Sequence, residues 1–547
     1  MITETPPRRL IAPAAPPPAD PLGWGQRARL FGASGAGAVL FVVALTLASL
    51  VLRTGQLSFH YWIDETISIG IASHPLSMLP ALLRQDGSPP LYYALLHVWI
   101  GIFGSREVAT HLLSLCFATI AIPVSYLAAG NLFGRRTGVF AAVLAAGLPF
   151  LTDYGQETRM YALTALESLV VSLAFVRAFV DRRRRWLPVF SVSLAAMLYT
   201  HNWALFFTLA AVLAFAGCAM ASPRPRKALW RDGLLAFGAA ALIFLPWLPT
   251  LLYQARHTGA PWAVAPVLWS LTQGLYFVAG GRGVAVALAL AAGAGLVALR
   301  GNGSPRTSAA QSPSERRILV SAASLAVLSF GTLLIAWVYA KATPAWSGRY
   351  LAVIVGPLIL LFALGLARAR GLGVAALVLV CCLWAVNPQP SSPFFKSNVA
   401  AVAATIGERA GPATLVLATQ PEQVPALAYY LPHSDRFASP LGLTSDPGVM
   451  DWRNALGRFR HSSVRSVLAP LISGLRPGTR VLLVTPVSFQ PVPEWMVLIH
   501  RSSRTWARFL LHDRSLRRIA VGGPHAGGPG VNVRAQLFVV RAGQPAG

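Results

Sequence analysis

Long apolar runs separated by short basic clusters dominate most of this chain. Runs of about 20 apolar residues, each long enough to cross ~30 Å of hydrocarbon, recur along about the first 390 positions. The first begins after about 30 residues and is not clearly followed by a small-residue cleavage site, so it is interpreted as an anchor. The pattern predicts a mostly α-helical, polytopic membrane protein.

The basic clusters predict how the chain crosses the membrane. They lie at 135–136, 182–185, 224–227, 306–317 and 368–370. Because cytoplasmic loops are enriched in Lys and Arg, the chain should cross an even number of times between successive clusters. The predicted spans are 31–52, 107–130, two within 137–180, two within 186–220, 233–251, 281–299, two within 318–367, and 371–387, eleven in all. Segments 89–103 and 266–280 are then left over and are predicted to be helices in the outer interface.

The same pattern divides the chain into three parts. Residues 1–30 are Pro-rich and basic, and are predicted to be disordered and cytoplasmic. Residues 31–387 form the transmembrane core, with a first outer loop at 53–106. Residues 388–547 are more polar, with short β-like runs at 413–418, 480–486 and 536–541 and a helical stretch at 421–431. They are predicted to form a small extracytoplasmic α/β domain.

Composition supports a membrane protein and argues against a nucleic-acid partner. The chain is 55% hydrophobic and 12% charged, whereas soluble domains are about 25% charged. The formal charge of +27 comes largely from Arg clusters between apolar runs, as the positive-inside rule requires. All four cysteines lie in apolar stretches, with no spacing typical of zinc and no disulfide framework in the polar tail.

Charge parity places one set of polar residues on the outer face. The first loop carries Asp64 and Glu65 within HYWIDETISIG. The other outer-face candidates are Arg84, Asp86, Gln156, Glu157, Arg159, Tyr161, His201, Arg349 and Tyr350. A carboxylate can take a proton from an acceptor hydroxyl while guanidinium groups hold a phosphate leaving group. Taken singly, each of these has a simpler explanation. The acidic pair is also typical of a solvated helix start, and arginines at such positions are typical of interface anchors. His201 is typical of a polar turn.

Several short motifs in a fixed order resemble a known family. They are the acidic pair of the first loop, DGSPPLYYALLHVW (86–99), NLFGRR (131–136), YGQETRMYAL (154–163), YTHNWALF (199–206) and SGRYL (347–351). Over about residues 31–387 the chain resembles the GT-C glycosyltransferases of the protein O-mannosyltransferase and aminoarabinose-transferase type. The resemblance implies transfer of a sugar from a polyprenyl-phosphate donor, with inversion at the anomeric carbon, on the outer side of the plasma membrane.

The resemblance also implies roles for individual residues. Asp64 would be the general base, and Glu65 would help to place the acceptor. Asp86 lies near the family's second acidic position and is the candidate for a divalent metal, the only cofactor considered. Arg84, Arg159, Arg349 and Tyr350 would hold the donor phosphate, with Gln156, Glu157, Tyr161 and His201 in support. Many relatives have His or Lys where this chain has Ser88, which weakens the case for a metal or phosphate contact there.

Two other functions remain alternatives. A lipid-linked-sugar transporter would also have many spans, but it would place ionisable groups at mid-membrane and often show internal repeats. A non-catalytic envelope-assembly scaffold would tolerate alanine at Asp64, whereas an enzyme would not. Within the transferase interpretation the sugar is mannose or another hexose or pentose, and the acceptor is a protein, a glycolipid or a polysaccharide.

Overall fold

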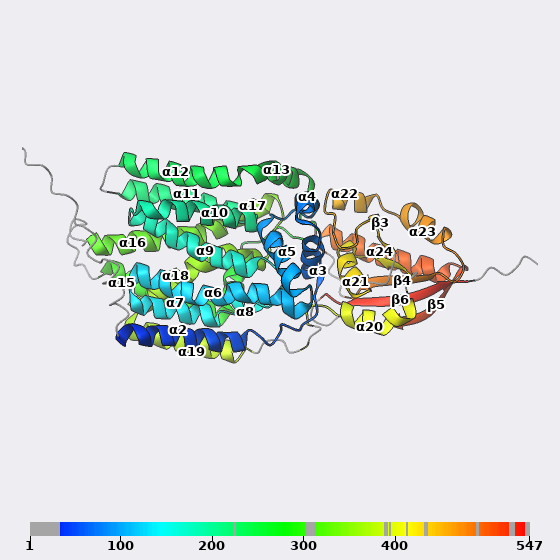
Figure 1. Cartoon of the computed structure of the whole chain (residues 1–547), viewed down its shortest axis with the longest axis horizontal. Coiled ribbons are helices and arrows are strands. Elements are labelled where there is room, and N and C mark those ends of the chain that lie inside the picture. The colour runs from blue at the N-terminus through cyan, green and yellow to red at the C-terminus, as the bar shows by residue number, and fades with distance from the viewer. Residues whose placement is uncertain are drawn as a thin grey trace, which may run out of the picture.

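The computed structural model is elongated, with a helical bundle and a smaller sheet-containing domain placed end to end (Figure 1). It describes residues 33–222, 226–301, 313–387, 392, 395–411, 414–431, 436–487, 492–523 and 531–541. The predicted disordered N-terminus, residues 1–30, lies outside the described residues.

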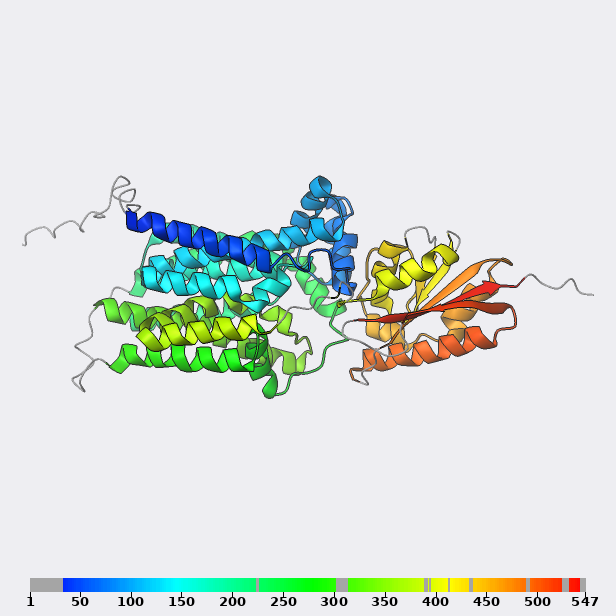
Figure 2. The same cartoon turned by 90° about the horizontal axis from the view of Figure 1, so that it is seen from below.

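The bundle is built from roughly parallel and antiparallel apolar helices (Figures 1 and 2). They are α2 (Ala33–Leu52), α6 (Glu107–Phe133), α7 (Arg135–Gly147), α9 (Tyr161–Phe175), α10 (Leu187–Thr200), α11 (Ala204–Ala221), α12 (Arg226–Phe244), α15 (Arg282–Gly301), α16 (Pro313–Ala326), α17 (Thr332–Ala342), α18 (Ala352–Arg368) and α19 (Arg370–Ala385). Helix α18 lies at the centre, where it packs against α6, α7, α9, α15, α16 and α19.

Seven helical segments in the described part of the chain are long and apolar enough to cross a membrane. They are Glu107–Phe133, Tyr161–Val180, Ala204–Ala221, Arg226–His257, Arg282–Leu299, Pro313–Ala342 and Gly348–Arg368. The other four predicted spans coincide with α2, α7, α10 and α19, which do not pass that test. These four pack against the longer helices, but the count of eleven and the orientation of the termini stay predictions.

Shorter helices cover one end of the bundle. They are α3 (Ile63–Ala72), α4 (Leu79–Asp86), α5 (Leu91–Phe103), α8 (Pro149–Tyr154), α13 (Leu248–His257) and α14 (Trp269–Ala279). The segments Ile63–Ala72 and Leu76–Asp86 meet at 113°, and α3 runs across the bundle axis (Figure 1). The two helices predicted at 89–103 and 266–280 are thus present as α5 and α14.

The C-terminal domain is a mixed sheet with helices on both faces. Its strands are β1 (Leu415–Ala418), β2 (Arg436–Ser439), β3 (Gly442–Thr444), β4 (Arg480–Pro486), β5 (Leu516–Gly522) and β6 (Val533–Val540), in the order β3-β2-β1-β4-β6-β5. Strand β1 is parallel to β2 and β4, and the other pairs are antiparallel. The predicted α/β character and the three predicted strands are confirmed.

Alternate residues of the strands face two separate apolar layers, as the two-residue period of a strand requires. Helices α20 (Val399–Ala410) and α21 (Val424–Tyr430) cover one face, where Val416 and Leu482 point. Helices α23 (Ala469–Ser473) and α24 (Glu494–His512) cover the other, around Leu417 and Leu483. The short helix α22 (Ala455–Arg460) packs against α24.

This domain is docked on the segment that joins α2 to α6. The backbone N–H of Trp452 donates to the carbonyl of Gln85 at 3.0 Å, and α21 packs against α3. The two segments approach so closely at Gly70 that a Cβ there would lie 1.8 Å from the carbonyl oxygen of Gly448. Glycine is therefore needed in α3, and the helix with the acidic pair is held between the bundle and the C-terminal domain.

Candidate active site

The acidic pair lies in the first turn of α3. Trp62, just before the helix, has extended backbone geometry, and its N–H donates to the Glu65 carboxylate at 3.4 Å. Carboxylates are stabilised in a first turn because the unpaired N–H groups carry partial positive charge there. The sequence WIDE thus both starts the helix and directs two carboxylates to different surroundings.

Asp64 is paired with a distant arginine. Nη1 of Arg349 lies 2.8 Å from Oδ2 of Asp64, and both side chains are largely shielded from solvent. Arg349 comes from the 3₁₀ turn η7 (Gly348–Leu351) before α18. Its guanidinium lies 5.2 Å and 5.3 Å from the ring centres of Trp62 and Trp262. Aromatic faces and a carboxylate therefore hold one cation beside the candidate base.

Glu65, in contrast, is fully buried. Its carboxylate lies 2.7 Å from Nε2 of His111 and 3.4 Å from Nζ of Lys396, and accepts from the N–H of Thr158 at 2.9 Å. Burial by itself would raise the pKa of Glu65, but the charges of Lys396 and His111 with these hydrogen bonds outweigh it and hold the pKa below its usual range. No surface is left for an acceptor to touch, so a role in placing the acceptor would be indirect.

Arg159 fixes α3 against the loop that precedes α9. It donates to the carbonyl of Asp64 at 3.2 Å and to Oγ of Ser68 at 2.8 Å. Its Nε is buried without a partner in the described part of the chain. Arg159 therefore holds the helix turn that presents Asp64, and its Nε–H is available to donate a hydrogen bond to a ligand.

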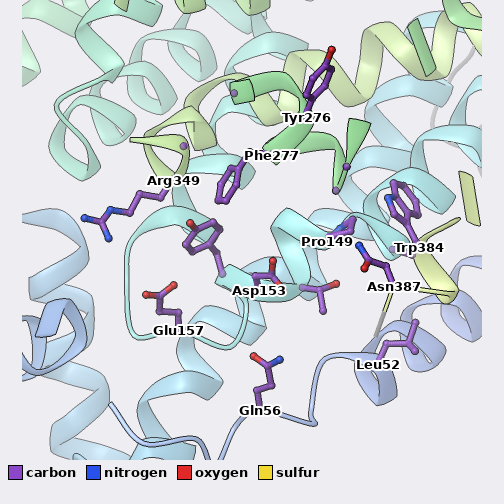
Figure 3. Close-up of a pocket in the computed structure, with 18 of the residues that line it drawn as sticks. Leu52, Gln56, Pro149, Asp153, Glu157, Tyr276, Phe277, Arg349, Trp384 and Asn387 are labelled. Atoms are coloured by element: carbon purple, nitrogen blue, oxygen red, sulfur yellow. The ribbon is translucent and has the colours of Figure 1, made fainter. Parts of the chain in front are cut away.

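A cavity of about 1420 Å³ opens beside this turn. Its charged end is lined by Glu157, Arg349 and Lys396, together with Trp62. The rest is lined mainly by apolar residues of α2, α7, α14 and α19, with the polar side chains of Asp153, Gln273 and Arg282 among them. Figure 3 shows Arg349 and Glu157 near one end and Trp384 and Leu52 far from them. The shape suits an amphiphile with an anionic head and a long apolar tail.

The comparisons with known proteins agree on the architecture. The model of the family described as dolichyl-phosphate-mannose-protein mannosyltransferase matches residues 87–253. The crystal structure of ArnT from Cupriavidus metallidurans in the apo state superposes with a TM-score of 0.58 and 13% identity, covering 94% of this chain and 100% of that one. ArnT from the same organism bound to undecaprenyl phosphate gives 0.55 and 13%, covering 93% and 99%. The chain has the GT-C fold of the ArnT-type membrane glycosyltransferases. No curated protein matches the sequence.

Within this GT-C fold, the aromatic and histidine candidates gather beside Arg349. The ring centres of His201 and Tyr161 lie 5.1 Å and 6.4 Å from that of Tyr350. Burial, with the charges of Arg159 and Arg349, lowers the pKa of His201 to about 3. His201 is therefore neutral at working pH and shapes the site rather than contributing charge.

Three other candidates make no direct contact with the Asp64–Arg349 pair in the described part of the chain, although Asp86 is near enough for the charges of Arg159 and Asp64 to act on its pKa. Arg84 is exposed and stacks on Tyr253 at 4.1 Å. Asp86 accepts from the hydroxyl of Tyr93 at 3.4 Å, and burial raises its pKa. In the described segments no three His, Cys, Asp or Glu side chains are arranged to hold a metal ion, and a metal at Asp86 stays a prediction. Gln156 accepts from the N–H of Gln56 at 2.7 Å and is structural.

Sequence reasoning missed Lys396 and His111. Lys396 follows the last helix of the bundle, donates to the carbonyl of Gln156 at 3.0 Å and lines the cavity. A lone lysine in a polar stretch gives no signal, since its partner Glu65 lies 331 residues away. His111 lies in an apolar run, where only the burial of a polar ring in a predicted helix could have indicated a partner.

We expect Glu65→Leu to destabilise the GT-C fold. It would leave Lys396 and His111 without their buried carboxylate, and breaking such a pair costs about 3–5 kcal/mol. Because the folded pKa is depressed, Glu65 contributes stability above the unfolded value of about 4.3 and loses it as pH falls through the folded pKa. Thermal unfolding in detergent should show a large gap between wild type and variant at pH 7 and a smaller one at pH 4. Equal melting temperatures at pH 7 would contradict the network.

Proposed function

We propose that this GT-C protein transfers a sugar from a polyprenyl-phosphate donor to an acceptor hydroxyl on the outer side of the membrane, with Asp64 as the general base. The observation that carries the proposal is the cavity, which joins apolar helix faces to the charged end. There Arg349 contacts Asp64. A soluble sugar nucleotide would need no such apolar wall, whereas a polyprenyl chain does. The undecaprenyl phosphate in the similar ArnT structure supports the same class of donor.

Arg349 and Lys396 would bind the donor phosphate. Both line the cavity, and Nε of Arg349 is buried without a partner in the described segments. A guanidinium can bind two phosphate oxygens in parallel, and its hydrogen bonds to a charged group are strong. Arg159 would support them through α3, and Tyr350 through its contact with Arg349 at 5.7 Å.

The reaction needs one proton transfer and one bond exchange. The acceptor oxygen attacks the anomeric carbon, the carbon–oxygen bond to the phosphate breaks, and the phosphate leaves with the electron pair. The hydroxyl proton passes to Asp64. In the free protein Arg349 neutralises Asp64 at 2.8 Å. Donor binding would draw the guanidinium toward the phosphate, leaving Asp64 a stronger base and stabilising the leaving charge in a partly dehydrated site.

The direct test is release of polyprenyl phosphate. Purified protein would be given a panel of radiolabelled polyprenyl-phosphate hexoses and pentoses, with and without glycoside acceptors. Release above that of boiled protein would support the transferase and identify the donor. Binding of the donors without release, with or without acceptors, would favour the transporter or scaffold alternatives.

The predicted location is the plasma membrane, with a cytoplasmic N-terminus and an outer C-terminal domain.

We expect the rate to fall at alkaline pH because of Glu157. Burial raises the pKa of Glu157. The positive charge of Lys396 opposes this rise, and the negative charge of Glu65 adds to it. Its Oε1 accepts from Nε1 of Trp62 at 2.6 Å, at the charged end of the cavity. Below its raised pKa the side chain is neutral and does not repel the donor phosphate; above it, the carboxylate does.

The pH dependence of kcat/KM for the donor measures this effect. Glu157→Gln should flatten the alkaline limb, and Glu107→Gln, outside the cavity, should leave it in place. An unchanged alkaline limb in Glu157→Gln would assign that limb to another group.

A further inference from the structure

One turn of the C-terminal domain concentrates buried polar atoms that have no partner. Gln420, Glu422 and Gln423 are 6%, 5% and 1% exposed. In the described part of the chain, both amide atoms of Gln423, Oε2 of Glu422 and Oε1 of Gln420 lack hydrogen bonds. Each unpaired buried polar atom costs about 1–3 kcal/mol. A turn that carries four therefore calls for a reason beyond folding.

The turn lies over the catalytic helix. It contains η8 (Pro421–Gln423) and leads into α21, which packs on α3. Burial raises the pKa of Glu422, and the negative charge of Asp64 is near enough to add to that shift. The turn belongs to the C-terminal domain, whereas the donor cavity with Arg349 lies in the bundle. The turn thus lies against the helix that carries Asp64, and Asp64 in turn contacts Arg349 of the donor cavity.

The remaining atoms of the turn are held in place. Oε1 of Glu422 accepts from Nε1 of Trp495 at 3.1 Å and from Nε2 of Gln420 at 3.0 Å. The ring of Trp495 packs at 5.5 Å on Trp452, whose N–H donates to the carbonyl of Gln85 in the first outer loop. The unpaired atoms are therefore buried within a hydrogen-bonded and aromatic frame, and are not exposed surface groups.

We propose that Gln420, Glu422 and Gln423 bind the hydroxyl groups of a glycan acceptor and present one of them to Asp64. The inference rests on the proposed function and extends it, because it assigns the acceptor half of the site to the C-terminal domain. An amide offers both donors and an acceptor, and a carboxylate oxygen accepts, which matches sugar hydroxyls. The Glu422 carboxylate disfavours an anionic group here. Since the atoms are closed from solvent in the docked domain, acceptor entry requires the turn to separate from α3.

Gln423→Leu distinguishes this proposal from a merely water-filled turn. Replacing an unpaired buried amide by an apolar side chain of similar size is neutral or stabilising when nothing binds it. We expect a melting temperature at or above that of wild type, together with an acceptor KM raised about 10-fold or more. Donor hydrolysis in the absence of acceptor should be unchanged.

The assay would use the whole protein in detergent or nanodiscs, the donor selected above, and a panel of octyl glucoside, mannoside, galactoside and arabinoside as acceptor probes. Gln536→Leu on β6 is the matched control, since it makes the same chemical change on a half-buried strand position outside the turn. Glu422→Gln tests the carboxylate independently and should also raise the acceptor KM.

Each outcome decides something different. A raised acceptor KM in both turn variants, with donor hydrolysis intact, supports the acceptor site. An acceptor KM equal to wild type in Gln423→Leu overturns it, as does transfer by wild type to none of the glycosides while donor hydrolysis proceeds. Absence of donor hydrolysis in wild type would instead contradict the proposed function itself.

Discussion

Asp64→Asn should lower the rate of sugar transfer about 10²–10⁴-fold, the usual contribution of a positioned general base. Asparagine has nearly the same shape and its amide oxygen still accepts from Arg349, whose Nη1 lies 2.8 Å from Oδ2 of Asp64. It cannot take the acceptor proton. Binding of the donor should persist or tighten, because Arg349 no longer has to leave a carboxylate. Single-turnover transfer and donor binding, measured on the same preparation, separate the two effects.

The matched control is Asp446→Asn. Asp446 is also a carboxylate in a charged pair near α3, with Oδ2 3.0 Å from Nε2 of His74, but it belongs to the docking surface of the C-terminal domain. It should keep near-normal transfer. If Asp64→Asn transfers sugar at the wild-type rate, Asp64 is not the base, and Asp86 becomes the next carboxylate to test.

Those properties that depend on local pattern could be predicted from the sequence. Apolar runs and basic clusters indicate the helices of the bundle, and the helices predicted at 89–103 and 266–280 are present as α5 and α14; their place in the interface stays a prediction. The β-like runs of the tail form β1, β4 and β6. The sequence indicates Asp64 and Arg349 as site candidates because a carboxylate can take a hydroxyl proton while a guanidinium holds a phosphate, and the structure pairs them.

Properties that depend on distant packing could not be predicted. Adjacent residues Asp64 and Glu65 look equivalent in sequence, yet one lines up with Arg349 and the other is enclosed by His111 and Lys396. The difference arises because successive positions of a helix face about 100° apart. In addition, the segment with Lys396, far along the chain, closes over Glu65. The role of Gln423 likewise depends on where the C-terminal domain docks.

Arg349→Met should lower kcat about 10²–10³-fold, as loss of one preorganised donor to a developing negative charge does. The guanidinium lies between the faces of Trp62 and Trp262, so little further reorganisation is needed when the phosphate leaves, once donor binding has drawn Arg349 from Asp64. Arg349→Lys should recover only part of the rate, since an ammonium lacks the planar fork that binds two phosphate oxygens.

Arg256→Met, an exposed arginine of α13, is the control for loss of general positive charge and should keep the wild-type rate. The decisive comparison is between kcat at saturating donor and the affinity for the donor. In Arg349→Met the defect should be in the chemical step measured at saturating donor, because the arginine acts most strongly when the carbon–oxygen bond breaks. A variant that loses only donor affinity, with kcat intact, would show that Arg349 binds the phosphate equally before and during reaction, and that Lys396 or Arg159 carries the stabilisation of the leaving group.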